Sequence, residues 1–513
     1  MQNTISSMAR AIPRMLLIVS ALTFLLSTPA LASYAIYVGR NLTADGSTLV
    51  GGTGDEPSSH WLEIVPRRVH PAGETIKVGV TRSATFPGEL IDIPQAAATA
   101  GYITMNYSEY EGFPAPLTNG GLNDYGVAVR DVWSPSRDEL LKMTPSPQRG
   151  VNYSDLSRIA MERAHTAREA VEIVGGLIDR YGYATYGGNS HLFADANEGW
   201  VLIDFAGGKG LWIAERLGPD EIRMSYPGYI LNIPVDFEKH PDRYRGSKNF
   251  ISFATEQGWY NPKSGKPFNV NVVYQAGTGR SPAVQVMEQR LRQQVAAAKL
   301  SLRQFMDLVR DPLVSGDQNG YGEVVQLRSG ITRPEMHLLW VAATGSITAP
   351  FVPYWTGNEA VLPEYGKHRY LSTHESEGFV TKDFQIQEAS QFAYVTFKRL
   401  MYYTCDKPEK FLPEVTEALT AFENQSIAEI NRVERRADTL FAAEQPAMAR
   451  DELTGYSNQR AMDALHLGEA LLGSIETRHR LLYGFRAPEN AQMSGTDDDR
   501  EAPVGCGKVL PWE

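Results

Sequence analysis

The spacing of apolar residues predicts a β-hairpin soon after an apolar leader segment. Residues 34–38 and 47–52 are rich in the β-branched, aromatic and small residues of strands, and the turn sequence Thr-Ala-Asp-Gly at 43–46 separates them. Further strands are expected at 61–65, 75–80, 102–107 and, around a turn at 123–126, within 122–132. The chain from residue 34 to residue 132 is therefore predicted to be mainly β-structure, opening with a hairpin.

A helical period follows, then more strands, then a long helical stretch. Apolar residues recur at helical spacing over 154–178, with Ser154 and Asp155 available as caps. Strands are expected at 191–194, 200–205 and 211–214, and helices at 384–403, 412–441 and 459–483. This order predicts an α+β fold with a helical C-terminal region, divided as residues 33–375 for the core and 376–513 for a helical extension packed on it.

The leader has the layout of a secretory signal peptide. Arg10 and Arg14 precede the apolar run 15–26, and Ala30-Leu31-Ala32 forms a small-residue cleavage site. We expect cleavage after Ala32 and a secreted or periplasmic protein, with translation starting at Met1 or Met8. No later stretch reaches the ~20 apolar residues of a membrane span.

Cleavage after Ala32 makes Ser33 the new N-terminus. A terminal residue with a hydroxyl carries its own general base, the α-amine, whose unperturbed pKa is about 7.7 to 8.0. Many exported proteins begin with Ser only because signal cleavage tolerates small residues. The catalytic interpretation therefore needs support from the rest of the chain.

Composition excludes several classes of function. Removing residues 1–32 leaves 47 Lys and Arg against 60 Asp and Glu, a net charge of −13, which argues against nucleic acid as a partner. The ten histidines show no metal-ligand spacing, so no metal or other cofactor is expected. The two cysteines, Cys405 and Cys506, either form a disulfide or remain thiols, and the oligomeric state stays open.

Several segments in a consistent order carry a family resemblance. They are 33–40, 45–48, 106–110, 119–128, 193–200 and 340–354, together with Asp55 and the Ala-Arg-Glu-Ala sequence around Arg168. These segments resemble the C69 dipeptidases, which are N-terminal-nucleophile (Ntn) hydrolases. The resemblance implies an αββα sandwich of two stacked antiparallel sheets, a nucleophile at the end of a central strand, and a dipeptide or short peptide as substrate.

Two departures from the family pattern bear on the chemistry. Ser33 stands where the family typically has Cys, and Gly52-Thr53-Gly54-Asp55 stands where it usually has Arg-Asn-x-Asp, so only Asp55 remains. A serine attacks as a neutral hydroxyl and depends more on a base than on anion stabilisation, so losing Cys and Arg together is compatible with activity. The alternatives are a catalytically inactive binding protein with the same fold and an acylase acting on N-acyl substrates.

The site residues follow from this interpretation. Ser33 is the predicted nucleophile, and Asp55 is expected to hold the α-amine or a substrate amine. Asn119 and Asn189 are candidates for the oxyanion site, with turn formation as the alternative role for each. Arg130 is a candidate for binding a substrate carboxylate, and the alternative is a structural ion pair, since Asp131 is its neighbour.

Overall fold

Two antiparallel sheets form the centre of the computed structural model, which describes residues 33–54, 60–107, 112–225, 229–275, 282–316, 319–366, 392–484 and 506. Within these residues one sheet has six strands, in the order β14 (Ile222–Ser225), β1 (Ala35–Val38), β2 (Thr48–Gly54), β18 (Tyr321–Leu327), β19 (Leu338–Ala342) and β20 (Val352–Trp355). The other has eight, in the order β16 (Tyr244–Gly246), β13 (Trp212–Leu217), β12 (Gly199–Phe205), β11 (Gly188–Ala194), β10 (Ala128–Trp133), β9 (Leu117–Asn123), β8 (Tyr102–Tyr107) and β3 (His60–Val65).

Short elements extend from these sheets. The described two-stranded pairs are β4 (Arg68–Val69) with β7 (Ala98–Thr99), β5 (Thr75–Val78) with β6 (Ile91–Pro94), and β15 (Asn232–Ile233) with β17 (Phe268–Asn269). The short helices are α1 (Asp138–Met143), α4 (Phe250–Glu256) and α5 (Val270–Tyr274), and the 3₁₀ turns are η1 (Arg40–Leu42), η2 (Phe237–Lys239), η3 (Pro262–Ser264) and η4 (Pro334–Met336).

The predicted N-terminal hairpin is confirmed as β1 and β2. The Thr43 hydroxyl donates to the Ser47 carbonyl at 2.6 Å, and the Asp45 carboxylate accepts from the Ser47 amide at 3.0 Å. Gly46 adopts φ 76°, which a glycine reaches without a steric penalty. These contacts close the connection and fix the register of β1 on β2.

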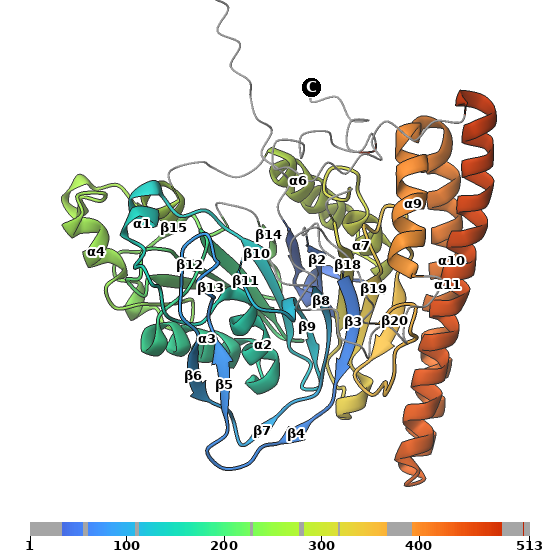
Figure 1. Cartoon of the computed structure of the whole chain (residues 1–513), viewed down its shortest axis with the longest axis horizontal. Helices are drawn as coiled ribbons and strands as arrows, with labels where there is room; N and C mark the ends of the chain where they lie inside the picture. The colour runs from blue at the N-terminus through green and yellow to red at the C-terminus, as the bar shows by residue number, and fades with distance from the viewer. Residues whose placement is uncertain are drawn as a thin grey trace, which may run out of the picture. The chain divides into compact units, whose positions relative to one another are not determined.

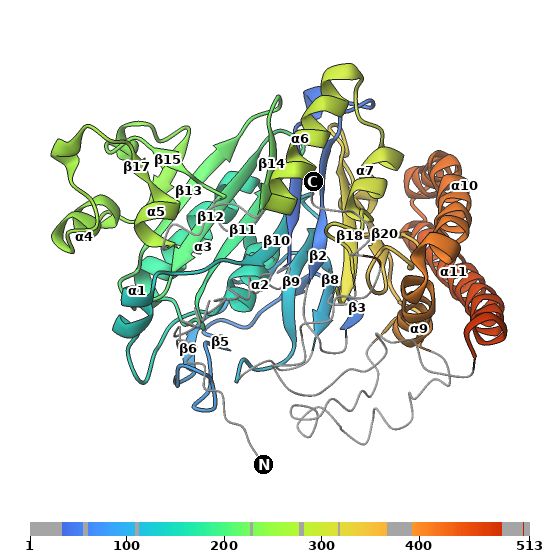
Figure 2. The same ribbon diagram turned by 90° about the horizontal axis from the view of Figure 1, so that it is seen from above.

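Helices cover the outer face of each sheet, so the predicted four-layer αββα sandwich is confirmed (Figure 2). Helices α2 (Tyr153–Arg163) and α3 (Ala167–Tyr181) pack on the eight-stranded sheet, and α6 (Pro282–Ala297) and α7 (Leu302–Val309) pack on the six-stranded sheet. Between the sheets lies a buried apolar core that includes Tyr37, Val50, Leu192 and Ile203. The apolar faces of both sheets are thereby removed from water.

The prediction of a single helix over 154–178 is wrong, because α2 and α3 are separate helices. Asn152, rather than Ser154, is the N-cap of α2, and it forms a capping box with Asp155. The chain leaves helical geometry at Ala164, and Thr166 caps α3 by accepting from the Glu169 amide at 3.1 Å. Apolar periodicity continued across this break, so it did not reveal the two ends.

The C-terminal helices α9 (Ala393–Asp406), α10 (Pro408–Ala442) and α11 (Pro446–Tyr483) pack against one another at the β20 edge of the six-stranded sheet (Figure 1). Cys405 in α9 forms a disulfide with Cys506, which resolves the alternatives left by the sequence. Long as they are, the helices in the described part of the chain lack an apolar stretch able to cross a membrane. The predicted leader 1–32 and the boundary at 375/376 lie outside the described residues.

Candidate functional site

The Ser33 end of β1 is anchored by three hydrogen bonds. The Ala35 amide donates to Ser225 Oγ at 2.8 Å, and the Thr53 amide donates to the Tyr34 carbonyl at 3.1 Å. On the helix side, the Tyr34 hydroxyl donates to the Val309 carbonyl at 2.6 Å. Ser33 itself is 5% exposed. The backbone that carries the predicted nucleophile is therefore held in place by β2, β14 and α7.

Strand register places Ser33 beside two residues of the six-stranded sheet. Ala35 pairs with Gly52, which pairs with Glu323 in β18, and Gly54 pairs with Tyr321. Continuing the β1 register by two residues puts Ser33 in the row of Gly54 and Tyr321.

The alternation of side chains shows which face this row occupies. A Cβ atom on Gly199, in the eight-stranded sheet, would lie 2.5 Å from the Tyr37 ring, so Tyr37 points between the sheets. Successive side chains of a strand point to opposite faces, so Ser33 and Ala35 point to the same face as Tyr37, and Tyr34 points to the other. A Cβ atom on Gly51 would instead meet Phe305 of α7, at 2.8 Å. The candidate site thus lies on the inner face of the six-stranded sheet.

The Arg130 side chain extends from β10 of the eight-stranded sheet to the inner face of the six-stranded sheet. Its guanidinium donates to Glu323 Oε2 at 2.6 Å, to the Tyr321 hydroxyl at 3.1 Å and to the Thr53 carbonyl at 2.8 Å. Arg130 and Glu323 are both 0% exposed. Burial opposes the charge on Arg130, but Tyr321 and Glu323 outweigh it and raise the Arg130 pKa. Burial raises the pKa of Glu323, although Arg130 opposes that change.

This geometry favours the structural ion pair over a carboxylate-binding role for Arg130. The partner is Glu323 and not the sequence neighbour Asp131, because adjacent strand residues point to opposite faces. The sequence could not identify this partner, since β18 lies far along the chain from β10.

Asn119 and Asn189 lie together, on the other face of the eight-stranded sheet. The Asn119 side chain donates to Asp131 Oδ2 at 3.1 Å, and the Asn189 side chain donates to Asp131 Oδ1. This face packs on α2, whose Ser157 contacts His191. The structure therefore brings the two amides to Asp131 and not to the Ser33 side of the sheet, and their oxyanion role stays a prediction.

A second carboxylate extends this buried polar group. The backbone amide of Asn189 donates to Asp204 Oδ1 at 2.9 Å, and His191 Nε2 lies 3.2 Å from Asp204 Oδ2. Burial raises the pKa of Asp204, and His191 acts in the opposite direction. These contacts join β10, β11 and β12 beneath the helix layer, which is a structural function.

Gly52 occupies a position that has no room for a side chain. Its φ is 157°, and a Cβ atom there would lie 2.0 Å from the Tyr34 carbonyl oxygen and 3.0 Å from the Ala35 Cα. Asp55, the predicted partner of the α-amine, lies outside the described residues. Its role stays a prediction.

His60 is a residue near the site that the sequence did not indicate. Its ring is buried, stacks on Tyr107 with centroids 5.3 Å apart, and lies 5.4 Å from the Tyr321 ring. A Cβ atom on Gly320 would lie within 2.4 Å of the His60 ring, and the Gly320 amide donates to the Gly54 carbonyl at 2.7 Å. His60 therefore lies next to Gly320 and Tyr321, at the end of β18 that pairs with Gly54. Among the described residues, no group of His, Cys, Asp or Glu is arranged to hold a metal ion.

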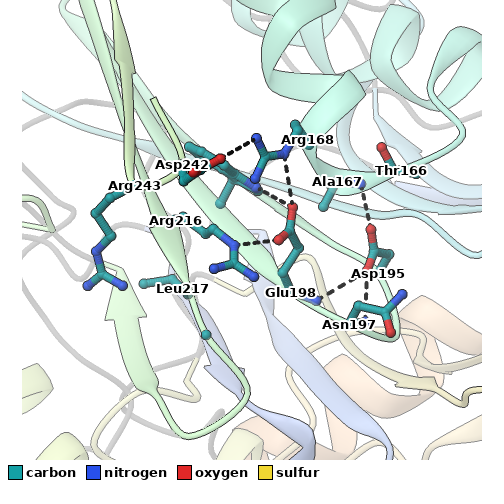
Figure 3. Close-up of polar contacts among 12 residues, drawn as sticks. Thr166, Ala167, Arg168, Asp195, Asn197, Glu198, Arg216, Leu217, Asp242 and Arg243 are labelled. Carbon is teal, nitrogen blue, oxygen red and sulfur yellow. Dashed lines mark hydrogen bonds and ion pairs between the residues drawn. The ribbon is translucent and has the colours of Figure 1, made fainter. Parts of the chain in front are cut away.

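One segment that carries the resemblance has a structural role. Asp195 accepts from the Asn197 amide at 2.8 Å and from the Ala167 amide at 2.9 Å, so one carboxylate closes the β11–β12 turn and holds the first turn of α3 (Figure 3). Glu198 in the same turn bonds Arg216 and lies 3.6 Å from Arg168. These contacts hold the β11–β12 turn against α3 and so support the sandwich.

Comparison with known proteins places the Ser33 strand in a family. The family model of peptidase family C69 matches residues 32–283. Residues 32–283 thus belong to peptidase family C69. This C69 segment begins one residue before Ser33 and includes Arg130, whereas Tyr321, Glu323 and the helices α9 to α11 follow it.

Relatives of this chain carry dipeptidase names. Probable dipeptidase B from Streptococcus pyogenes serotype M1 is 27% identical over 224 residues, which is 43% of this chain and 42% of that protein. A probable dipeptidase from Latilactobacillus sakei is 25% identical over 233 residues, 44% of this chain and 45% of that protein. The chain thus matches less than half the length of these relatives. A solved structure of a mutant conjugated bile acid hydrolase from Clostridium perfringens aligns with a TM-score of 0.34 at 9% identity, over 64% of this chain and 93% of that one.

Proposed function

We propose that this C69 protein is an exported dipeptidase whose nucleophile is Ser33, exposed by cleavage after Ala32. The observation that carries the proposal is the position of Ser33 at the anchored end of β1, facing the space between the sheets, at the start of the C69 segment. The names of the relatives support a peptide substrate.

The proposed reaction passes every proton through the α-amine of the mature N-terminus. Ser33 Oγ attacks the carbonyl carbon of the peptide bond, and the Ser33 α-amine accepts the hydroxyl proton. The amine then gives that proton to the leaving amino group as the C–N bond breaks. Water, deprotonated by the same amine, hydrolyses the resulting ester and restores the Ser33 hydroxyl. Asp55 is assigned the task of orienting the amine through a charge-assisted hydrogen bond.

The disulfide supports the proposed compartment. Cys405 and Cys506 pair across 101 positions of sequence, and structural disulfides persist mainly in oxidising compartments. The signal-peptide pattern before Ser33 agrees with that setting.

The test is hydrolysis of a mixed dipeptide panel by mature protein that begins at Ser33, beside its Ser33→Ala variant. We expect turnover by the mature protein and a loss of at least about a thousandfold in the variant, because a nucleophile cannot be replaced by a methyl group. Circular dichroism provides the folding control. Equal turnover by both proteins rejects the mechanism, and no turnover by either favours a binding protein. N-acyl amides in the same panel detect the acylase alternative.

A further inference from the structure

The inner face of β2 contributes no side chains beside the Ser33 end of β1. Gly52 and Gly54 take the two inner positions, between Ala35 on one side and Glu323 and Tyr321 on the other. Arg130 donates to the carbonyl of Thr53, the residue between these two glycines, at 2.8 Å. The guanidinium from the facing sheet therefore lies over β2.

The positive charge of the ion pair consequently lies nearer to Ser33 than the negative charge does. The strand order is β1, β2 and β18, so the cation over β2 stands between Ser33 on β1 and the Glu323 carboxylate on β18. Neighbouring strands are about 4.8 Å apart. The positive charge is thus about one strand spacing from the Ser33 strand, and the negative charge is about two.

We propose that the buried Arg130–Glu323 pair favours the neutral, base-competent form of the Ser33 α-amine, by presenting its positive end to the mature N-terminus. The proposal rests on the proposed function, which makes that amine the base. A nearer cation disfavours a second positive charge more than the farther carboxylate favours it. The buried setting strengthens this difference, because solvent screens the charges weakly there.

Among the described residues, the titratable side chains Tyr321 and His60 lie near the pair. Tyr321 faces the guanidinium from β18, and its ring centroid lies 5.2 Å away. His60 of β3 stands behind Tyr321, at 5.4 Å between ring centroids. The described inner positions of β1 and β2 next to the pair are Ala35, Gly52 and Gly54, which have no ionisable side chain. Asp131 points to the opposite face of β10.

The test measures the protonation of the amine directly by nuclear magnetic resonance. Mature protein is labelled with carbonyl-¹³C serine and ¹⁵N tyrosine, which marks the Ser-Tyr bonds at 33–34 and 225–226. The signal that Ser33→Ala removes belongs to Ser33, and its shift with pH follows the α-amine. This readout works whether or not the protein turns over a substrate.

Three variants change the charges in different ways. Glu323→Gln leaves the cation unbalanced, and we expect the midpoint of the Ser33 titration to fall by about one pH unit, from one charge about two strand spacings away at an effective dielectric constant of about 20. Glu323→Asp keeps the carboxylate and should retain the wild-type midpoint. Arg130→Met/Glu323→Gln removes both charges, and its midpoint should lie above that of wild type.

The double variant keeps the test decisive if Glu323→Gln does not fold, since it leaves no buried charge unpaired. In active protein, the acidic limb of kcat/KM should move with the midpoint. An unchanged or higher midpoint in folded Glu323→Gln, or an unchanged midpoint in the double variant, overturns the inference. Loss of turnover with Ser33→Ala tests the proposed function separately.

Discussion

A Cβ atom on Gly52 would lie 2.0 Å from the carbonyl oxygen of Tyr34, the residue after the proposed nucleophile. The sequence showed that the arginine usual in the family is missing at this position, but not why. The structure gives a steric reason, because the backbone of β1 fills the place of a side chain. Ser33 as a candidate nucleophile could be predicted from the cleavage site together with the family resemblance. The partners of Arg130, Asn119 and Asn189 could not, since they depend on which face of a strand each side chain takes.

Gly52→Ala tests this steric explanation. We expect the added methyl to push Tyr34 away, lower turnover at least about tenfold and destabilise the fold by about 1–3 kcal/mol. The matched control is Gly176→Ala in α3, where a Cβ atom meets nothing within 4 Å. This control should be neutral or stabilising by up to about 1 kcal/mol. Urea unfolding and turnover are measured for both, and equal behaviour would contradict the explanation.

Strand predictions were more accurate than helix boundaries at the scale of elements. β8 has the predicted bounds, and β1, β2 and β3 differ by a few residues, because runs of β-branched and aromatic residues bounded by turn residues mark strands locally. The break between α2 and α3 was missed because apolar periodicity continued across the local Thr166 cap, and Asp195 of a distant turn also binds the Ala167 amide. Tertiary contacts of this kind leave no local pattern in the sequence.

Glu423 illustrates how one residue attaches the helical region to the core. Its buried carboxylate accepts from Arg310 and Arg303 near α7 and from the Phe351 amide at 2.8 Å before β20. Burial opposes its ionisation, but Arg310 and Arg303 outweigh burial and hold the Glu423 pKa below its usual value of 4.5. Helix α10 is therefore joined to both α7 and the six-stranded sheet by one charged cluster.

We expect Glu423→Gln to lower the free energy of unfolding by about 3–5 kcal/mol at pH 7, because the buried Arg310 and the partly buried Arg303 lose a carboxylate partner. Because the folded-state pKa is depressed, the contribution of the wild-type carboxylate is fully present above about pH 4.5 and is lost as the pH falls through the folded-state value. The difference between the proteins should accordingly shrink in acid. Glu417→Gln, an exposed position on α10, serves as the control. A pH-independent difference would contradict this account.

For the whole molecule, the family resemblance implied the αββα order and the apolar pattern predicted the helical C-terminal region, but neither showed how the two are connected. A disulfide between Cys405 and Cys506 was one of two open alternatives, because spacing along the chain does not give distance in space. The Cα atoms of the two cysteines lie 4.6 Å apart. The bond joins Cys506 to α9, next to Ile347 of the core.

Reducing this disulfide should destabilise the protein, because the bond closes a loop of 101 positions in the unfolded chain. The chain-entropy treatment gives an upper value of about 4–5 kcal/mol for such a loop. Denaturant unfolding with and without reductant measures the change. The Cys405→Ser/Cys506→Ser variant should unfold like the reduced protein and ignore the reductant. Identical unfolding of the oxidised and reduced wild type would show that the bond contributes nothing.

The central claim is that a free Ser33 amine is the catalytic base, and the most direct test compares two forms that differ by one residue. Protein beginning at Ser33 and protein that retains Ala32 are assayed on the same dipeptides at the same pH. We predict that retaining Ala32 lowers turnover at least about a hundredfold, because the base becomes part of a peptide bond. Equal turnover by the two forms would contradict the account.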